Sequence, residues 1–357
     1  MWSPLLLVTP LLAALSLANP LPKAEQTDLP RLIVYFQTTH TQAGEPISML
    51  PLINEKGIAL THLIVCSLHI NKDSVIHLND YPPDNQRFET LWEEAAVLKA
   101  AGVKIMGMVG GAAAGSFDYT TLDGPTDTFE HYYGQLRDVI VNFQLQGMDL
   151  DVEQRMSQGG ISRLVSRLYA DFGSDFLITL APVASELAGG GGLSGFNYTT
   201  LEAQNGSAIA FYNAQFYSGF GSMASTSDYN RIISSGWKPA DIVAGQLTSP
   251  NNGYGYIPYS QLNATIIALR KKYGQIGGIM GWEYFNSEPG ETAQPWKWAQ
   301  IMTQILRPNS VPKLQITRSD AERLQETYAK SWRAAYGEFT SFSQPQPAVD
   351  YMKMVTA

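Results

Sequence analysis

The chain has 357 residues, of which 45% are hydrophobic and 16% are charged, and its formal net charge is −8. This is the composition of a globular protein, and the length suffices for one large domain or two small ones. The negative charge argues against nucleic acid or an anionic membrane surface as a partner.

The N-terminus predicts a secretory signal peptide. An apolar run from Leu5 to Leu17 is too short to span a bilayer, and Ser16-Leu17-Ala18 forms a small-x-small cleavage pattern. We expect cleavage near Ala18, a short N-terminal or pro-segment over residues 19–30, and a secreted, extracellular protein that is not held in a membrane. Three glycosylation sequons are compatible with this route, and they begin at Asn197, Asn205 and Asn263.

Short β-rich runs recur along the chain, with amphipathic stretches between them. They lie about 30 to 43 residues apart, the length of a strand, a helix and two loops. Eight such repeats favour a (β/α)₈ TIM barrel, an α/β fold, which we expect to occupy residues 31–310 as a single domain. The predicted strands are Leu32–Gln37, Leu63–His69, Lys104–Val109, Gly147–Glu153, Leu177–Ala181, Phe211–Phe216, Ile242–Gln246 and Gly278–Trp282.

Helix signals agree with this arrangement. Gly102, Gly173 and Gly274 each follow an amphipathic stretch, as expected of helix stops. Beyond the barrel, residues 311–357 predict a C-terminal helix and tail: Ser319 and Glu322 have capping-box spacing, and a polar helix would follow.

The fourth predicted strand carries three acids at alternating positions, Asp149, Asp151 and Glu153. Alternation places them on one face. Because helical patterns flank the strand, it belongs to a parallel array in which both faces are normally buried. Interior acids are costly unless they are paired or protonated, so the row indicates a functional site.

The row of acids has two other interpretations. The acids could form the wet face of an edge strand, or they could bind calcium or magnesium, but no calcium loop surrounds them and the histidines are scattered. We expect no metal and no other cofactor. The single cysteine, Cys66, lies in an apolar run and is expected to be a buried, inert thiol. Gly110-Gly111 follows a strand but does not form a nucleotide-binding loop.

Four motifs in these strands resemble those of glycoside hydrolase family 18. The strand-four signature DGxDxDxE appears as residues 146–153, with Gln146 in place of its first Asp. The third-strand SxGG appears as Met108-Val109-Gly110-Gly111, with Met in place of Ser. The sixth-strand tyrosine falls at Tyr217 and the eighth-strand tryptophan at Trp282. Within the family, the chain is most similar to the compact secreted fungal endo-β-N-acetylglucosaminidases.

The resemblance implies substrate-assisted retention. Glu153 would be the acid and then the base, Asp151 would stabilise the acetamido group, and Asp149 would share a proton with them. Tyr217 would donate to the acetamido carbonyl, and Trp282 would form a floor under the sugar. Further substrate-binding candidates are Gln215, Gly110, Gly111, Tyr35 and Gln37.

Two departures from the family pattern carry expectations of their own. Gln146 would alter local hydrogen bonding only. Met108 would replace a polar residue under the carboxylates, so the proton balance of Asp149 would differ from that usual in the family.

The substrate would be an N-linked glycan, cut between its two core GlcNAc residues. The alternative is an endochitinase with the same chemistry acting on a chitin oligosaccharide. A non-catalytic sugar-binding barrel is the remote alternative, but it would be expected to lack the acid at position 153. The protein is expected to act as a monomer.

Overall fold

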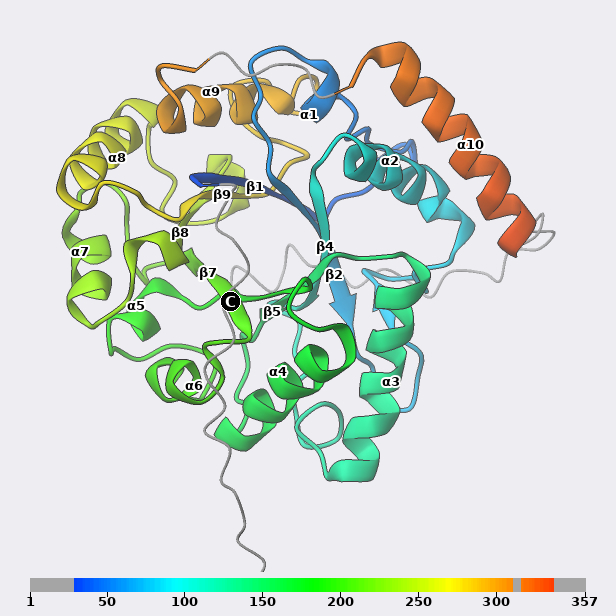
Figure 1. Cartoon of the computed structure of the whole chain (residues 1–357), viewed down its shortest axis with the longest axis horizontal. Helices are drawn as coiled ribbons and strands as arrows, with labels where there is room; N and C mark the ends of the chain where they lie inside the picture. Colours follow the sequence, from blue (N-terminus) through cyan, green and yellow to red (C-terminus); the bar gives the residue numbers. More distant parts are fainter. Residues whose placement is uncertain (1–28, 311–315, 337–357) are drawn as a thin grey trace, which may run out of the picture.

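The computed structural model describes residues 29–310 and 316–336, and the predicted signal peptide and C-terminal tail lie outside these ranges. Eight parallel strands pair in the order β1-β9-β8-β7-β6-β5-β4-β2, and β1 also pairs with β2, which closes the sheet into a barrel. Figure 1 shows the strands at the centre of a ring of helices. The predicted (β/α)₈ barrel is confirmed. Its strands are β1 (Arg31–Phe36), β2 (His62–His69), β4 (Lys104–Gly110), β5 (Gly147–Asp151), β6 (Leu177–Leu180), β7 (Ile209–Gln215), β8 (Ile242–Leu247) and β9 (Gly278–Trp282).

The predicted strands correspond one to one with these eight, and their ends differ by at most two residues. One further strand, β3 (His77–Leu78), was not predicted. It pairs antiparallel with the end of β2, Leu68 opposite Leu78 and His69 opposite His77. Two residues are too few to show an alternating pattern, so this pairing left no signal in the sequence.

The helices lie outside the barrel and contribute their apolar faces to the layer between helices and strands (Figure 1). Gly102, Gly173 and Gly274 all have positive φ just beyond a helix, as their predicted role requires. Within the described ranges, no helix has both the length and the apolarity needed to cross a bilayer. The helices are α1 (Pro51–Asn54), α2 (Glu89–Ala100), α3 (Thr126–Asn142), α4 (Gln158–Phe172), α5 (Ala184–Leu187), α6 (Tyr198–Asn205), α7 (Ser227–Ser234), α8 (Tyr259–Tyr273), α9 (Trp296–Leu306) and α10 (Arg318–Tyr336), with short 3₁₀ turns η1 (Gln86–Phe88), η2 (Pro239–Asp241) and η3 (Pro250–Asn252).

The barrel has a second, smaller core inside it. Alternate residues of the strands fill this interior, which explains why the strands read as nearly continuous apolar runs. Cys66 is fully buried there, as predicted, and burial raises the pKa of its thiol well above the usual value. The interior cluster comprises Ile33, Tyr35, Ile64, Cys66, Met106, Met108, Phe211, Tyr217, Val243, Leu247 and Met280.

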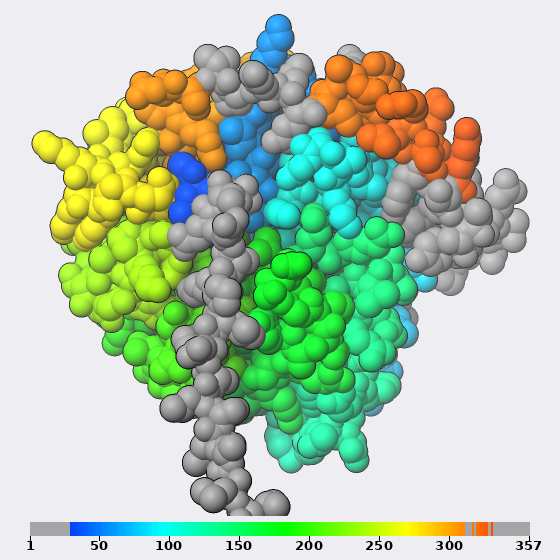
Figure 2. All heavy atoms as spheres, in the orientation of Figure 1, coloured from blue at the N-terminus to red at the C-terminus, as the bar shows by residue number. Residues whose placement is uncertain are grey.

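The C-terminal helix α10 begins one residue before the predicted cap. Its cap is Thr317, whose hydroxyl accepts a hydrogen bond from the amide of Asp320 at 3.2 Å. The predicted capping box of Ser319 and Glu322 is therefore wrong, because Ser319 already lies in the first turn. The helix packs on α2, where the Gln325 amide approaches a Glu93 carboxylate oxygen at 3.5 Å, and Figure 2 shows the two surfaces in contact.

Candidate active site

The three acids of the fourth repeat lie inside the barrel at the carboxyl end of β5. Asp149 and Asp151 are buried side chains of the strand itself, and Glu153 follows two residues beyond as a half-buried side chain. The period-two alternation predicted this common face. Carboxyl ends of barrel strands are where TIM-barrel sites are built, so the position agrees with a functional role.

Asp149 is held by neutral hydrogen-bond donors from three other strands. The Tyr35 hydroxyl donates to its Oδ2 at 2.6 Å, and the Thr179 hydroxyl and the Asn213 amide donate to its Oδ1 at 2.5 and 3.0 Å. Burial raises the pKa of Asp149, whereas these three donors lower it. A buried carboxyl group is thus accommodated without a cation beside it.

Asp151 and Glu153 form a hydrogen-bonded carboxyl pair. The Gln215 amide bridges them, donating to Asp151 Oδ1 at 3.1 Å and to Glu153 Oε1 at 3.2 Å. Burial, followed by the charges of Glu153 and Asp149, raises the pKa of Asp151 well above its usual value. Burial also raises the pKa of Glu153. Both shifts favour the protonated form of a carboxyl group, as expected where two acids are neighbours in a buried site.

Two aromatic residues complete the group. Tyr217 is buried, and its hydroxyl makes no hydrogen bond to another described residue. Burial raises the pKa of this hydroxyl well above its usual value, and the charges of Asp151 and Glu153 raise it further. Trp282 is partly exposed and meets Tyr35 edge to face, with ring centroids 5.8 Å apart. Since Tyr35 is bonded to Asp149, the indole is linked to the carboxyl row through one side chain.

Three of the predicted substrate-binding residues, Gly110, Gly111 and Gln37, contact the region of the site through their backbone. Gly111 contributes its backbone, donating its amide to the Asp151 carbonyl at 2.9 Å. Gly110 packs against the same carbonyl and the ring of Phe117. The backbone of Gln37 donates to Glu283 at 3.3 Å and accepts from the Asn79 amide at 2.9 Å, but its side chain makes no hydrogen bond to the carboxyl row.

Gly110 is expected to be structural. A side chain there would overlap the Asp151 carbonyl and Phe117, and the residue has φ +103°. Gly102 has φ +98° with open space around it and serves as the matched control. We expect Gly102→Ala to cost about 1 kcal/mol of unfolding free energy and Gly110→Ala about 3 kcal/mol, because overpacking adds to backbone strain. Urea unfolding measures both, and equal losses would contradict this account.

Sequence reasoning missed three residues of this region. Asn213 precedes Gln215 and Tyr217 at the same spacing of two, so alternation on that strand could have identified it. Thr179 left no such signal, and only the pairing of β5 with β6 sets it opposite Asp149. Glu283, next to Trp282, accepts from the Thr38 amide and hydroxyl, both at 2.8 Å.

The structure shows the contacts of the two residues that depart from the family pattern, Gln146 and Met108. The Gln146 side chain accepts the Ile105 amide at 3.1 Å, a local backbone contact. Met108 is buried beside Met106 and Cys66 in the barrel interior. Its thioether has no hydrogen to donate to Asp149. The neutral donors to that acid are Tyr35, Thr179 and Asn213.

A pocket of about 610 Å³ adjoins this site. Its lining includes Tyr254, 81% exposed, and Tyr256. The loop that carries them rests on the end of β7, because the Ser218 amide donates to the Tyr254 carbonyl at 2.7 Å and Gly255 packs on the Tyr217 backbone. An exposed aromatic beside Tyr217 can stack on a sugar ring.

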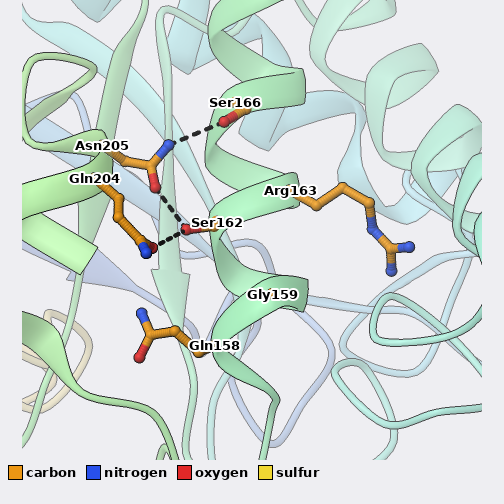
Figure 3. Close-up of a pocket in the computed structure, with 7 residues that line it drawn as sticks. All are labelled: Gln158, Gly159, Ser162, Arg163, Ser166, Gln204 and Asn205. Carbon is orange, nitrogen blue, oxygen red and sulfur yellow. Dashed lines mark hydrogen bonds between the residues drawn. The ribbon is translucent and has the colours of Figure 1, made fainter. Parts of the chain in front are cut away.

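A second pocket, of about 410 Å³, lies between α4 and α6, and Figure 3 shows its polar lining. The Ser162 hydroxyl lies 2.8 Å from the side-chain oxygen of Gln204 and 2.7 Å from that of Asn205, and none of the predicted site residues lines the pocket. Nowhere in residues 29–310 and 316–336 do three or more His, Cys, Asp or Glu side chains form a group that could hold a metal ion.

Comparison with solved structures identifies relatives over most of the chain. A fungal endo-β-N-acetylglucosaminidase of glycosyl hydrolase family 18 is 69% identical, with a TM-score of 0.78 over 79% of this chain and 100% of that one. Chitinase ChiC from Aspergillus fumigatus is 49% identical, with a TM-score of 0.70 over 76% of this chain and 98% of that one. A family 18 chitinase from Pseudoalteromonas aurantia, 21% identical with a TM-score of 0.63 over 77% of this chain and 100% of that one, shares the fold.

Other comparisons reach less far. Chitinase 2 of Rhizopus oligosporus is 30% identical over 148 residues, which are 39% of this chain and 25% of that protein. The match thus spans about a quarter of that curated relative. No protein-family model matches the sequence. The chain belongs to glycoside hydrolase family 18, because it is 69% identical to a solved member of that family and covers the whole length of that member.

Proposed function

We propose that the protein is an endo-β-N-acetylglucosaminidase that cleaves the GlcNAc-β1,4-GlcNAc core of N-linked glycans with retention of configuration. The observation that carries the proposal is the carboxyl pair of buried Asp151 and half-buried Glu153, which Gln215 bridges and whose charges act on Tyr217. The 69% identity to a fungal endo-β-N-acetylglucosaminidase supports the choice of substrate.

Glu153 is the acid in this mechanism. Its raised pKa keeps it protonated above the ordinary value of 4.5. It gives its proton to the glycosidic oxygen as the bond from that oxygen to C1 breaks. The acetamido carbonyl oxygen of the same sugar forms the new bond to C1, giving a cyclic oxazolinium ion and releasing the remainder of the substrate as an alcohol.

The second step reverses the roles. Glu153 is then a carboxylate and accepts a proton from water as the water oxygen bonds to C1. The bond from C1 to the oxazolinium oxygen breaks at the same time, which restores the acetamido group. Each step inverts C1, so the product retains the starting configuration. The substrate supplies the nucleophile, which explains why the second carboxyl group does not have to bond to carbon.

Asp151 orients and stabilises the acetamido group. Its carboxylate accepts a hydrogen bond from the acetamido N–H, where positive charge develops as the ring closes. Asp149 lies two residues behind it, fixed by Tyr35, Thr179 and Asn213. The charge of Asp149 contributes to the raised pKa of Asp151 and so helps to keep a proton on the pair.

The aromatic residues position the sugar. The Tyr217 hydroxyl donates to the acetamido carbonyl oxygen and holds it beneath C1. Trp282 offers a partly exposed indole on which the apolar face of the sugar stacks. Tyr217 follows the end of β7 and Trp282 ends β9, whereas the acids lie on or just after β5, so the barrel fixes their separation.

A chitinase is the second candidate, favoured by the 49% identity to chitinase ChiC. The chemistry at the carboxyl pair would be unchanged. What differs is the group beyond the cleaved bond, which is a protein-linked GlcNAc in one case and further β1,4-linked GlcNAc units in the other. The loops around the Tyr254 pocket would be the candidates to contact such groups.

The test compares two substrates with one enzyme preparation. We expect release of mannose-rich glycan from a denatured glycoprotein, with a single GlcNAc left on each asparagine, at a kcat/KM at least about tenfold above that for a chitin oligosaccharide. Mass spectrometry of the products measures both. Faster cleavage of the chitin oligosaccharide would assign the enzyme as a chitinase, and cleavage of neither would refute the mechanism.

A further inference from the structure

Glu186 lies outside the strand of the carboxyl pair, but its charge acts on Glu153. It belongs to the short helix α5, which follows β6 after the Ala181-Pro182-Val183 turn. Its Oε1 accepts the Ser194 amide at 3.0 Å and the Ser194 hydroxyl at 2.7 Å. No basic side chain in the described part of the chain lies within salt-bridge distance of it; burial raises its pKa, and Ser194 and the backbone of Leu193 and Val183 lower it.

These bonds fold the glycine-rich loop of residues 188–195 around the carboxylate. At the near end, the Gly190 amide donates to the Ser185 carbonyl at 2.8 Å and the Ser185 hydroxyl donates to the Gly191 carbonyl at 2.7 Å. At Gly192 a side chain would overlap the Glu186 carboxyl group. The glycine is therefore required because the acid occupies that space.

The far end of the same loop rests on the chain just beyond Glu153. The Met156 amide donates to the Ser194 carbonyl at 2.8 Å. Gly195, with φ +80°, approaches the Arg155 backbone so closely that a Cβ would lie 3.1 Å from its Cα. Ser194 thus contacts Glu186 through its side chain and amide, and the segment after Glu153 through its carbonyl.

The charge of Glu186 reaches the catalytic pair. Once ionised, it is one of the causes of the raised pKa of Glu153, after burial, and burial raises the pKa of Glu186 itself. The other titratable groups facing these two acids are Asp151 on β5, Tyr217 after β7 and the buried Tyr198 on α6, whose pKa is raised by burial and then by Glu186. None of these groups carries a positive charge, and Arg155, two residues beyond Glu153, has an exposed side chain.

We propose that Glu186 is a positioning residue for the acid step, which holds the 188–195 loop against the backbone behind Glu153 and sets a negative charge beside the carboxyl pair. The inference rests on the proposed function of Glu153. A negative neighbour disfavours ionisation of the pair, so the proton needed by the leaving group is retained to higher pH.

Glu186→Gln tests the charge without removing the acceptor, since the amide oxygen can still accept from Ser194. We expect the descending limb of the kcat–pH profile to move to lower pH by about half a unit, so that kcat falls about threefold above the limb and is unchanged on the plateau. The substrate is whichever one the wild-type enzyme cleaves.

Glu94→Gln is the matched control. Glu94 also accepts one serine hydroxyl and one backbone amide, from Ser48 at 2.8 Å and Met49 at 2.5 Å, but it lies on α2. The kcat–pH profile of Glu94→Gln should match that of the wild-type enzyme. An unmoved limb in Glu186→Gln, or an equal shift in Glu94→Gln, would overturn the proposal for Glu186.

Ser194→Ala separates position from charge and serves if Glu186→Gln fails to fold. It keeps the carboxylate but removes the hydroxyl that bonds it, so we expect a lower kcat at every pH and no shift of the limb. A wild-type kcat throughout would refute the role of the loop. An inactive wild type counts against the proposed function, whereas an active wild type with unmoved variants counts against Glu186 alone.

Discussion

Glu153→Gln is expected to lower kcat about 10³-fold while leaving KM within about threefold of the wild type. The amide matches the carboxyl group in size and can keep the hydrogen bond to Gln215 through its oxygen, but it has no proton to give to the leaving group. The loss corresponds to about 4 kcal/mol of transition-state stabilisation. Initial rates of glycan release, with binding measured by calorimetry on the inactive variant, test both parts.

Glu202→Gln is a suitable control for this variant. Glu202 accepts the Tyr212 hydroxyl at 2.7 Å on the helical side of the barrel, so the substitution removes a hydrogen-bonded carboxylate away from the site. Its kcat should stay within about twofold of the wild type. A Glu153→Gln enzyme with near-normal turnover would end the assignment of this residue as the acid.

The wild-type enzyme should also show the corresponding pH dependence. The acid step requires a protonated Glu153, and burial raises the pKa of that group. Activity is therefore retained above the ordinary glutamate value of 4.5 and is lost as the pH rises through the raised pKa. This descending limb should be absent from the residual activity of Glu153→Gln.

Asp151→Asn is expected to lower kcat about 10²-fold with little change in KM. The neutral amide can accept from the acetamido N–H but cannot match the positive charge that develops as the oxazolinium ring closes. The effect therefore falls on the transition state more than on the bound substrate, and it corresponds to about 3 kcal/mol. Steady-state kinetics on the preferred substrate separates the two parameters.

Asp241→Asn provides the comparison. Asp241 is also buried, but it lies just before β8, at the amino end of the barrel strands. We expect this variant to lose stability and to keep its turnover per folded molecule. If Asp151→Asn raised KM and left kcat unchanged, Asp151 would be a binding residue for the ground state and the proposed ring closure would lose its support.

Local patterns were sufficient for most of the barrel because they depend on neighbours in the chain. Alternation with period two gives the common face of Asp149, Asp151 and Glu153 wherever the strand lies. Positive φ at Gly102 is likewise a local requirement of a helix end. The predicted cap of α10 failed for a related reason, since Thr317 and Ser319 are both suitable caps and lie only two residues apart.

The surroundings of the acids could not be derived in that way. Asp149 meets Tyr35, Thr179 and Asn213, which come from three other strands, and only the closed sheet brings them within hydrogen-bond distance. The Gln215 bridge depends on the same closure. Sequence reasoning placed Tyr35 and Gln37 together as candidates, yet only the Tyr35 side chain reaches the carboxyl row.

The sequence by itself determined the eight-strand barrel, the row of acids and its resemblance to family 18, because each is written in spacing along one strand or in repeats along the chain. Tertiary structure alone decided which neutral donors surround Asp149 and which amide joins Asp151 to Glu153. It also decided that the glycine loop bonded to Glu186 rests on the segment after Glu153. Hydrogen bonds and charge act over a few ångströms of space, and residues this far apart in the chain come so close only when the barrel closes.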